Sequence, residues 1–149
     1  GAHAAFKQVR DAALAHIAPE QIEGILIEQM LTPGLEMIAG LRRDPSLGMA
    51  VVFGFGGVLA EIIEDVTVRF PPFGEAEARA MLGDLRGARL LGGYRSIEGA
   101  DIDQVVQFLT ALGELAMDLG PEVVAVDLNP VILNRNGVHI ADGLIELDS

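Results

Sequence analysis

Three oxygen-bearing side chains near the end of the chain have the chemistry of a metal site: Asp127, Asn129 and Asp142. Asp127 and Asn129 are two residues apart in a stretch with strand character, so both side chains are expected on one face of a sheet. Carboxylate and amide oxygens suit Mg²⁺, which takes one or two protein oxygens and completes its octahedron with water and phosphate oxygens. This pattern predicts a magnesium site next to nucleotide phosphates.

The separation of Asn129 and Asp142 depends on the hairpin turn between their strands. If residues 134–137 form a four-residue loop, Asn129 lies directly opposite Asp142, with Cβ atoms about 5 Å apart. If residues 136–137 form a two-residue turn instead, the register shifts by two and Asn129 faces Leu144. The alternative without a ligand is a solvated strand end, and spacing alone leaves all three interpretations open.

A glycine-rich stretch at residues 54–57 follows the apolar residues 51–53 and would let backbone N–H groups approach an anion. It lacks the Gly-Lys-Ser/Thr of a Walker loop and the third glycine of a dinucleotide fingerprint. A tight hairpin or a bulge explains it equally well. The acidic residues that follow, Glu61, Glu64 and Asp65, are more typical of a solvated strand edge than of a site.

Basic residues that could pair with phosphate are few. The guanidinium fork matches phosphate oxygens, although exposed arginines are common and need no function. The three histidines are scattered, and no metal-ligand spacing or serine–histidine–acid pattern includes them. Zinc and hydrolase chemistry are therefore disfavoured, and the candidate phosphate partners are Arg42, Arg43, Arg69 and Arg95.

The composition predicts one globular domain over residues 1–149. The chain has 10 basic and 22 acidic residues, a net charge of −12, and 50% hydrophobic residues. Such a polyanion lacks the basic surface that nucleic acid or anionic lipid requires. It has no cysteine, and its apolar runs are far shorter than the roughly 20 residues of a membrane span. We therefore expect a cytoplasmic protein, and homo-oligomerisation is left open.

Hydrophobic periodicity and turn signals predict an α+β fold with helices packed on one side of a mostly antiparallel sheet. A leading amphipathic helix is expected at 2–17, a short helix at 75–85, and a helix opened by Asp101 at 101–119. The expected strands are 22–31, 35–43, 50–54, 58–70, 123–128, 131–133 and 138–140.

Several segments together resemble one family, the C-terminal ATP-grasp subdomain of NDP-forming acyl-CoA synthetases. This group includes ADP-forming acetate–CoA ligase and is related to succinyl-CoA synthetase. The resemblance extends over about residues 20–147. The matching stretches keep their order and spacing: 22–30, 35–45, VFGFGGVLAE at 52–61, 64–70, LLGGYR at 90–95 and VDLNPV at 126–131.

The resemblance implies roles for individual residues. Asn129 and Asp142 would be the Mg²⁺ ligands beside the phosphates of ATP or ADP, with Asp127 as an auxiliary ligand. Glu36 and Arg42 would lie on a strand that lines the nucleotide cleft. The cleft's glycine-rich loop would contain Gly56, Gly57 and Glu61.

The resemblance also implies a reaction and partners. The family passes a phosphoryl group from ATP through a histidine to an acyl phosphate during acyl-CoA formation. The first ATP-grasp subdomain, with its phosphate-binding lysine, and the CoA-binding and phosphohistidine domain have no counterpart in this sequence. The isolated chain is therefore expected to be inactive. The alternative is a non-catalytic, ligand-sensing module of a synthetase-like domain fused to an acetyltransferase.

Overall fold

The computed structural model describes residues 1–57, 64–95 and 97–148. The chain forms two compact units, Gly1–Met30 and Leu31–Ser149. The first unit contains helix α1 (Ala2–Leu14) and the short 3-10 helix η1 (Pro19–Gln21). The leading helix predicted at 2–17 is therefore present but ends three residues early. No residue of α1 is buried.

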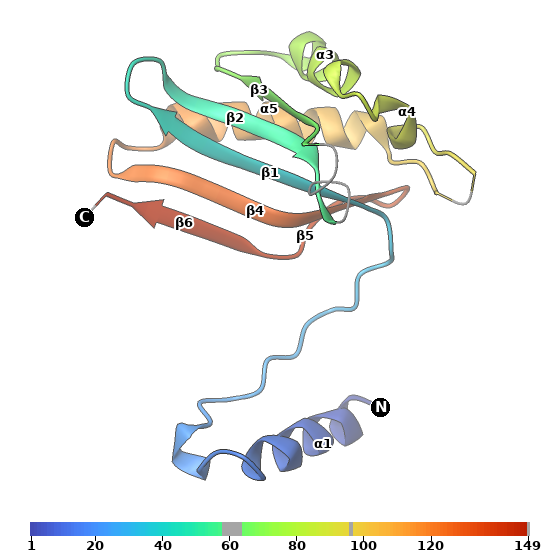
Figure 1. Cartoon of the computed structure of the whole chain (residues 1–149), viewed down its shortest axis with the longest axis vertical. Coiled ribbons are helices and arrows are strands. Elements are labelled where there is room, and N and C mark those ends of the chain that lie inside the picture. The colour runs from blue at the N-terminus through green and yellow to red at the C-terminus, as the bar shows by residue number, and fades with distance from the viewer. Residues whose placement is uncertain (58–63, 96, 149) are drawn as a thin grey trace. The chain divides into compact units, whose positions relative to one another are not determined.

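The second unit is built on one antiparallel sheet (Figure 1). Its strand order is β3-β2-β1-β4-β5. The long strand β4 has two partners on the same edge: its first part pairs with β6 and its last part pairs with β5. The strands are β1 (Leu35–Asp44), β2 (Gly48–Phe55), β3 (Val66–Arg69), β4 (Val123–Asn134), β5 (Gly137–Ile140) and β6 (Gly143–Leu147).

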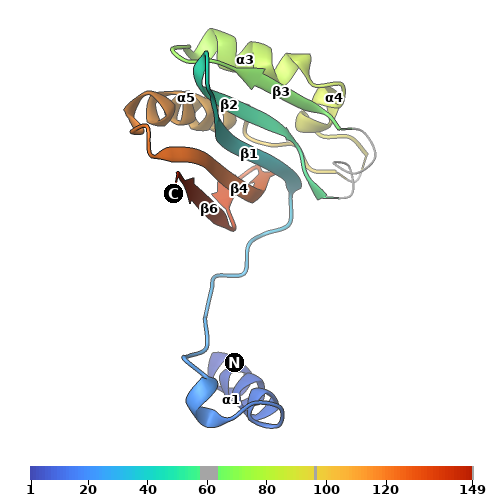
Figure 2. The same cartoon turned by 60° about the vertical axis from the view of Figure 1, so that its left-hand side comes forward.

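Among the described residues of this unit, three helices lie on one face of the sheet and none lies on the other face (Figure 2). They are α3 (Glu75–Asp84), α4 (Ala88–Leu91) and α5 (Ile102–Asp118). The long helix begins as predicted, because the Asp101 side chain accepts a hydrogen bond from the Gln104 backbone N–H at 3.2 Å. The predicted α+β architecture is confirmed.

Strand β1 shows how the sequence separates the two faces of the sheet. Met37, Ala39 and Leu41 are buried against the helices, whereas Glu36 and Arg42 are exposed. Successive side chains of a strand point to opposite faces, so this alternation gives one apolar and one partly polar face. The polar candidates Glu36 and Arg42 therefore lie on the face of the sheet away from the helices, which we call the open face.

The prediction of a strand at 22–31 is wrong. Residues 22–34 are irregular, and Leu26, Ile27 and Met30 are exposed by 81%, 68% and 92%. A strand needs a hydrogen-bonded neighbour, and an apolar sequence pattern alone does not provide one.

Two other predicted strands differ in extent. The strand expected at 58–70 is observed only as β3, and residues 58–63 lie outside the described residues. The strands expected at 123–128 and 131–133 form the single strand β4, which continues through Pro130. The predicted 54–57 turn begins later than expected, because β2 includes Gly54 and Phe55.

The described part of the chain contains no helix with both the length and the apolar character needed to cross a membrane.

Candidate functional site

Asn129 and Asp142 lie opposite one another across the C-terminal hairpin. Strand β4 pairs with β6 from Ala125 to Leu128 and with β5 from Val131 to Asn134, in one continuous register. Between these two segments, the backbone N–H of Asn129 donates to the carbonyl oxygen of Asp142 at 3.3 Å. This is the register expected for the longer loop, and the alternative pairing of Asn129 with Leu144 is wrong, because Leu144 pairs with Asp127.

A β-bulge places Asn129 at a break in the β1–β4 ladder. Met37 pairs with Val131, but Ala39 pairs with Leu128, so two residues of β4 face Ile38 alone. One of those two is Pro130, which has no N–H to contribute to the ladder. Bulges of this kind change the direction of a side chain and are frequent beside active sites.

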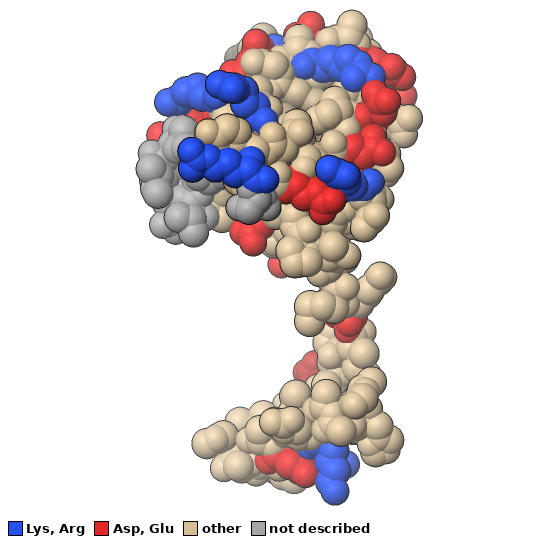
Figure 3. Space-filling view, turned by 90° about the vertical axis from the view of Figure 1, so that its right-hand side faces the viewer, with Lys and Arg blue, Asp and Glu red and all other residues tan. Residues whose placement is uncertain are grey.

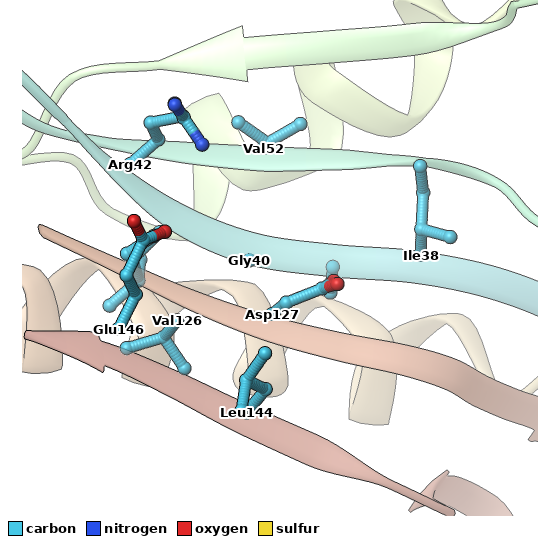
Figure 4. Close-up of a pocket in the computed structure, with 11 residues that line it drawn as sticks. Ile38, Gly40, Arg42, Val52, Val126, Asp127, Leu144 and Glu146 are labelled. Carbon is cyan, nitrogen blue, oxygen red and sulfur yellow. The ribbon is translucent and has the colours of Figure 1, made fainter.

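Asp127 lines a pocket of about 270 Å³ on the open face of the sheet. The pocket extends across β2, β1, β4 and β6, and Figure 4 shows Arg42, Asp127 and Glu146 projecting around it from three of these strands. Its other labelled lining residues are Ile38, Gly40, Val52, Val126 and Leu144.

Sequence reasoning missed Glu146 and Leu144 as pocket residues. Both lie on β6, which the predicted elements did not include, and they pair with Ala125 and Asp127 respectively. The alternation of Asp142, Leu144 and Glu146 would have placed these side chains on one face once the strand itself was recognised.

The glycine-rich stretch at Gly56 and Gly57 lies beside Glu36. The backbone N–H of Gly56 donates to the Glu36 carbonyl oxygen at 2.8 Å. Gly57 has φ +55°, and a Cβ atom there would lie 2.4 Å from the carboxylate oxygen Oε2 of Glu36. Only glycine adopts this backbone conformation without strain. Glu61, the remaining residue predicted for this loop, lies outside the described residues.

Arg42 lies near the end of β1 that is opposite to Glu36. It is six residues from Glu36 along β1, a separation of about 20 Å at the usual rise per residue. Even-numbered residues of β1 share the open face, so Glu36, Ile38 and Arg42 form one row along it. The candidate residues therefore follow the open face from the glycine loop to Arg42 instead of converging on one point.

The residues present fit a magnesium ion that is held partly by its ligand. Within the described ranges, Asp127 and Asp142 form no ion pair, and no three His, Cys, Asp or Glu side chains form a metal cluster. Asp142 uses Oδ1 to accept the Gly143 N–H at 2.8 Å, so Oδ2 is the oxygen left for a further partner. An amide and two exposed carboxylates match the few oxygen ligands that Mg²⁺ takes when phosphates supply others.

Two of the candidate phosphate-binding arginines have structural contacts instead. Arg43 donates to the carbonyl oxygens of Val123 and Gly120 at 2.8 and 2.6 Å. Arg69 forms ion pairs with Glu77 and Asp84 of α3, and the hydrogen bond with Glu77 is the main reason that its pKa is raised above the ordinary value. Both arginines hold the sheet to neighbouring segments.

A family model matches this sequence along nearly its whole length. The family model described as ATP-grasp domain matches residues 1–147. The chain belongs to the ATP-grasp domain family. The ATP-grasp assignment agrees with the sheet topology and confirms the resemblance seen in the motifs.

Two of the curated relatives of this chain are ADP-forming acetate–CoA ligases. The chain is 36% identical over 144 residues to the acetate–CoA ligase [ADP-forming] II subunit beta of Pyrococcus furiosus, covering 97% of this chain and 59% of that subunit. It is 36% identical over 138 residues to acetate–CoA ligase [ADP-forming] I of Archaeoglobus fulgidus, covering 93% of this chain and 20% of that protein. The ATP-grasp chain thus spans about three fifths of the first relative and one fifth of the second.

One solved structure has a closely similar fold. It is the Ca. Korarchaeum cryptofilum dinucleotide forming acetyl-coenzyme A synthetase 1 in complex with coenzyme A and Mg-AMPPCP. The TM-score is 0.80 at 37% identity, and the match covers 95% of this chain and 64% of that chain.

Proposed function

We propose that this chain is the nucleotide-binding and Mg²⁺-binding part of an ADP-forming acyl-CoA synthetase. The whole enzyme would transfer a phosphoryl group from ATP, by way of a phosphohistidine and an acyl phosphate, as it forms an acyl-CoA. The open face of the sheet would hold the nucleotide, and other domains of the synthetase would complete the site.

The pairing of Asn129 with Asp142 is the observation that supports this proposal most strongly. Asn129 lies in β4 and Asp142 in the link between β5 and β6, yet a backbone hydrogen bond joins them and both residues are exposed. Asp127 lies two residues from Asn129 and also lines the pocket. A bound Mg²⁺ would neutralise charge on the phosphate oxygens, and these three residues are the ones that would hold it.

The remaining predicted residues would bind and orient the nucleotide. Arg42 projects into the pocket and would supply positive charge to phosphate oxygens. The loop at Gly56 and Gly57 would offer backbone N–H groups, and Glu36 fixes this loop through its carbonyl oxygen. Ile38 and Val52 give the middle of the pocket an apolar surface suited to a flat ring.

The partners of this chain would be the first ATP-grasp subdomain and the CoA-binding and phosphohistidine domain. The limited coverage of the relatives supports this part of the proposal, because at least two fifths of each matched ligase lies outside the match. The similar solved structure was obtained with coenzyme A and a magnesium nucleotide analogue. The acid substrate would be selected by those other domains.

A nucleotide titration followed by NMR tests the binding role. Uniformly ¹⁵N-labelled chain is titrated with ADP in the presence of Mg²⁺ and again in the presence of EDTA. We expect the amide signals of Asn129 and Asp142 to shift at millimolar ligand only when Mg²⁺ is present, while that of Gly83 on α3 stays in place. Unmoved signals at both residues would overturn the proposal.

A complementation assay tests the catalytic role. The chain is mixed with the remaining domains of a related ADP-forming ligase, and acid-dependent and CoA-dependent ADP formation is measured. We expect activity with the wild-type chain and little with Asn129→Ala. Tight Mg²⁺·ADP binding without any activity would instead favour the ligand-sensing module.

A further inference from the structure

A second pocket lies in the loop that joins α4 to α5. It has a volume of about 440 Å³ and is lined by residues 92–95 and 97–99 and by Arg135 at the tip of the β4–β5 hairpin. Figure 3 shows several separate basic side chains, with acidic side chains among them, on the side of the domain where α4 and this loop lie. The pocket itself is lined by two arginines and one glutamate, a positive balance in a chain of net charge −12, which favours an anionic ligand.

We propose that this pocket binds a phosphoryl group through the guanidinium groups of Arg95 and Arg135. It shares no lining residue with the pocket on the open face of the sheet. The proposal is therefore independent of the nucleotide site.

Arg95 is held in an unusual backbone conformation. Its φ is +54°, a region that L-residues other than Gly, Asn and Asp seldom occupy. Its guanidinium carbon lies 5.3 Å from the centre of the Tyr94 ring, within the distance of a cation–π interaction. Strained residues of this type cluster at ligand sites. Among the ion pairs of the described residues, none involves Arg95.

The loop around Arg95 is closely packed. Tyr94 and Ile97 exchange two backbone hydrogen bonds, of 3.0 and 2.9 Å. A Cβ atom on Gly99 would lie 2.8 Å from the carbonyl group of Gly92, so the two backbone segments approach as only glycine permits. The loop therefore presents Arg95 from a defined framework.

Arg135 supplies the second guanidinium group. Its Nε lies 3.0 Å from Oε1 of Glu98, with the two side chains 75% and 53% exposed. Exposed ion pairs contribute little free energy, so a phosphoryl group can displace the Glu98 carboxylate. Two planar guanidinium groups match a tetrahedral dianion, which offers three oxygens to donors from different directions.

Two sources of the phosphoryl group share this chemistry, and the experiment separates them. Full-length chain is titrated in EDTA buffer of constant ionic strength with inorganic phosphate, and separately with a short phosphoserine peptide and its unphosphorylated form. Arginine Nε–Hε signals and calorimetry report binding. If inorganic phosphate binds and the phosphopeptide does not, the site is one for free phosphate. If the phosphopeptide binds and inorganic phosphate does not, the site recognises a phosphoryl group on a protein segment.

Substitutions show whether the binding belongs to this pocket. We expect Arg95→Gln and Arg135→Gln each to lower the affinity for the bound probe about tenfold, because each removes one charge-assisted contact. Glu98→Gln removes the competing carboxylate and should tighten binding severalfold, a gain that misfolding cannot produce.

The matched control is Arg79→Gln, because Arg79 also pairs with an exposed carboxylate, that of Asp103, but lies outside this pocket. We expect the Arg79→Gln variant to bind the phosphoryl probe with the same affinity as wild type. The proposal is overturned if neither probe binds, if Arg79→Gln weakens binding as much as Arg95→Gln, or if Glu98→Gln weakens it.

Discussion

Asn129 and Asp142 face each other at the point where the partner of β4 changes from β6 to β5. The Asn129 N–H donates to the Asp142 carbonyl oxygen at 3.3 Å, which links the backbones of the two proposed metal ligands. Twelve residues lie between them in the chain, and the β4–β5 hairpin brings them together. Because the two residues are this close, substituting them singly and together is the most direct test of the proposed magnesium site.

Removing either ligand should weaken Mg²⁺·ADP binding. We expect Asn129→Ala and Asp142→Ala each to reduce the affinity about tenfold. If both side chains hold one ion, the double variant should be little worse than either single variant, because the first substitution already removes most of the ion's benefit. Isothermal titration calorimetry of the three variants measures this coupling. Asn136→Ala, in the hairpin turn, is the control, and fully additive losses would contradict a shared ion.

Arg42 should contribute to nucleotide affinity but not to stability. Its side chain is exposed on the open face, so Arg42→Gln should leave the free energy of unfolding within about 0.5 kcal/mol of wild type. Loss of its charge should weaken ADP binding about tenfold, measured by calorimetry. Arg79→Gln, on the helix side of the domain, should change neither quantity. Unchanged ADP affinity in Arg42→Gln would remove Arg42 from the site.

Gly57 and Gly83 should respond in opposite directions to alanine. Gly57 has φ +55°, so Gly57→Ala should lower the free energy of unfolding by about 1–2 kcal/mol. Gly83 is in helix α3, and no atom lies within 4 Å of the place where its Cβ would be. Gly83→Ala should raise stability by about 0.5–1 kcal/mol. Urea denaturation measures both changes, and a stabilised Gly57→Ala variant would show that the loop does not require glycine.

The N-terminal cap of α5 should make stability depend on pH in the acid range. Hydrogen bonds from the Gln104 backbone N–H and side chain hold the pKa of Asp101 below its ordinary value of 3.8. A lowered folded-state pKa means that the capping contribution is complete above pH 3.8 and is lost as the pH falls through the folded-state value.

Melting temperatures of Asp101→Ala across a pH series should reveal this contribution. We expect the variant to melt below wild type at pH 7 and the difference to shrink as the pH falls below 3.8. Asp101→Asn, which keeps a capping oxygen without a titrating carboxyl group, should stay closer to wild type at pH 7. A difference that is constant with pH would contradict the assigned role of the carboxylate.

Local sequence signals were sufficient for several elements. The stripe of α5 with its Asp101 cap and the alternation of β1 depend on residues a few positions apart. Such features follow from backbone geometry and short-range hydrogen bonds. The apolar segment at 22–31 has the same kind of pattern, but it forms no strand because a strand also needs a partner.

The sequence by itself determined which side chains could bind a magnesium nucleotide and how they alternate along their own strands. Only the tertiary structure decided that Asn129 lies opposite Asp142 and not Leu144, and that Arg42, Asp127 and Glu146 surround one pocket. It also separated Arg43 and Arg69, which make structural contacts, from Arg42. The physical reason is that strand order and register depend on hydrogen bonds and packing between distant segments, which a local pattern permits but does not select.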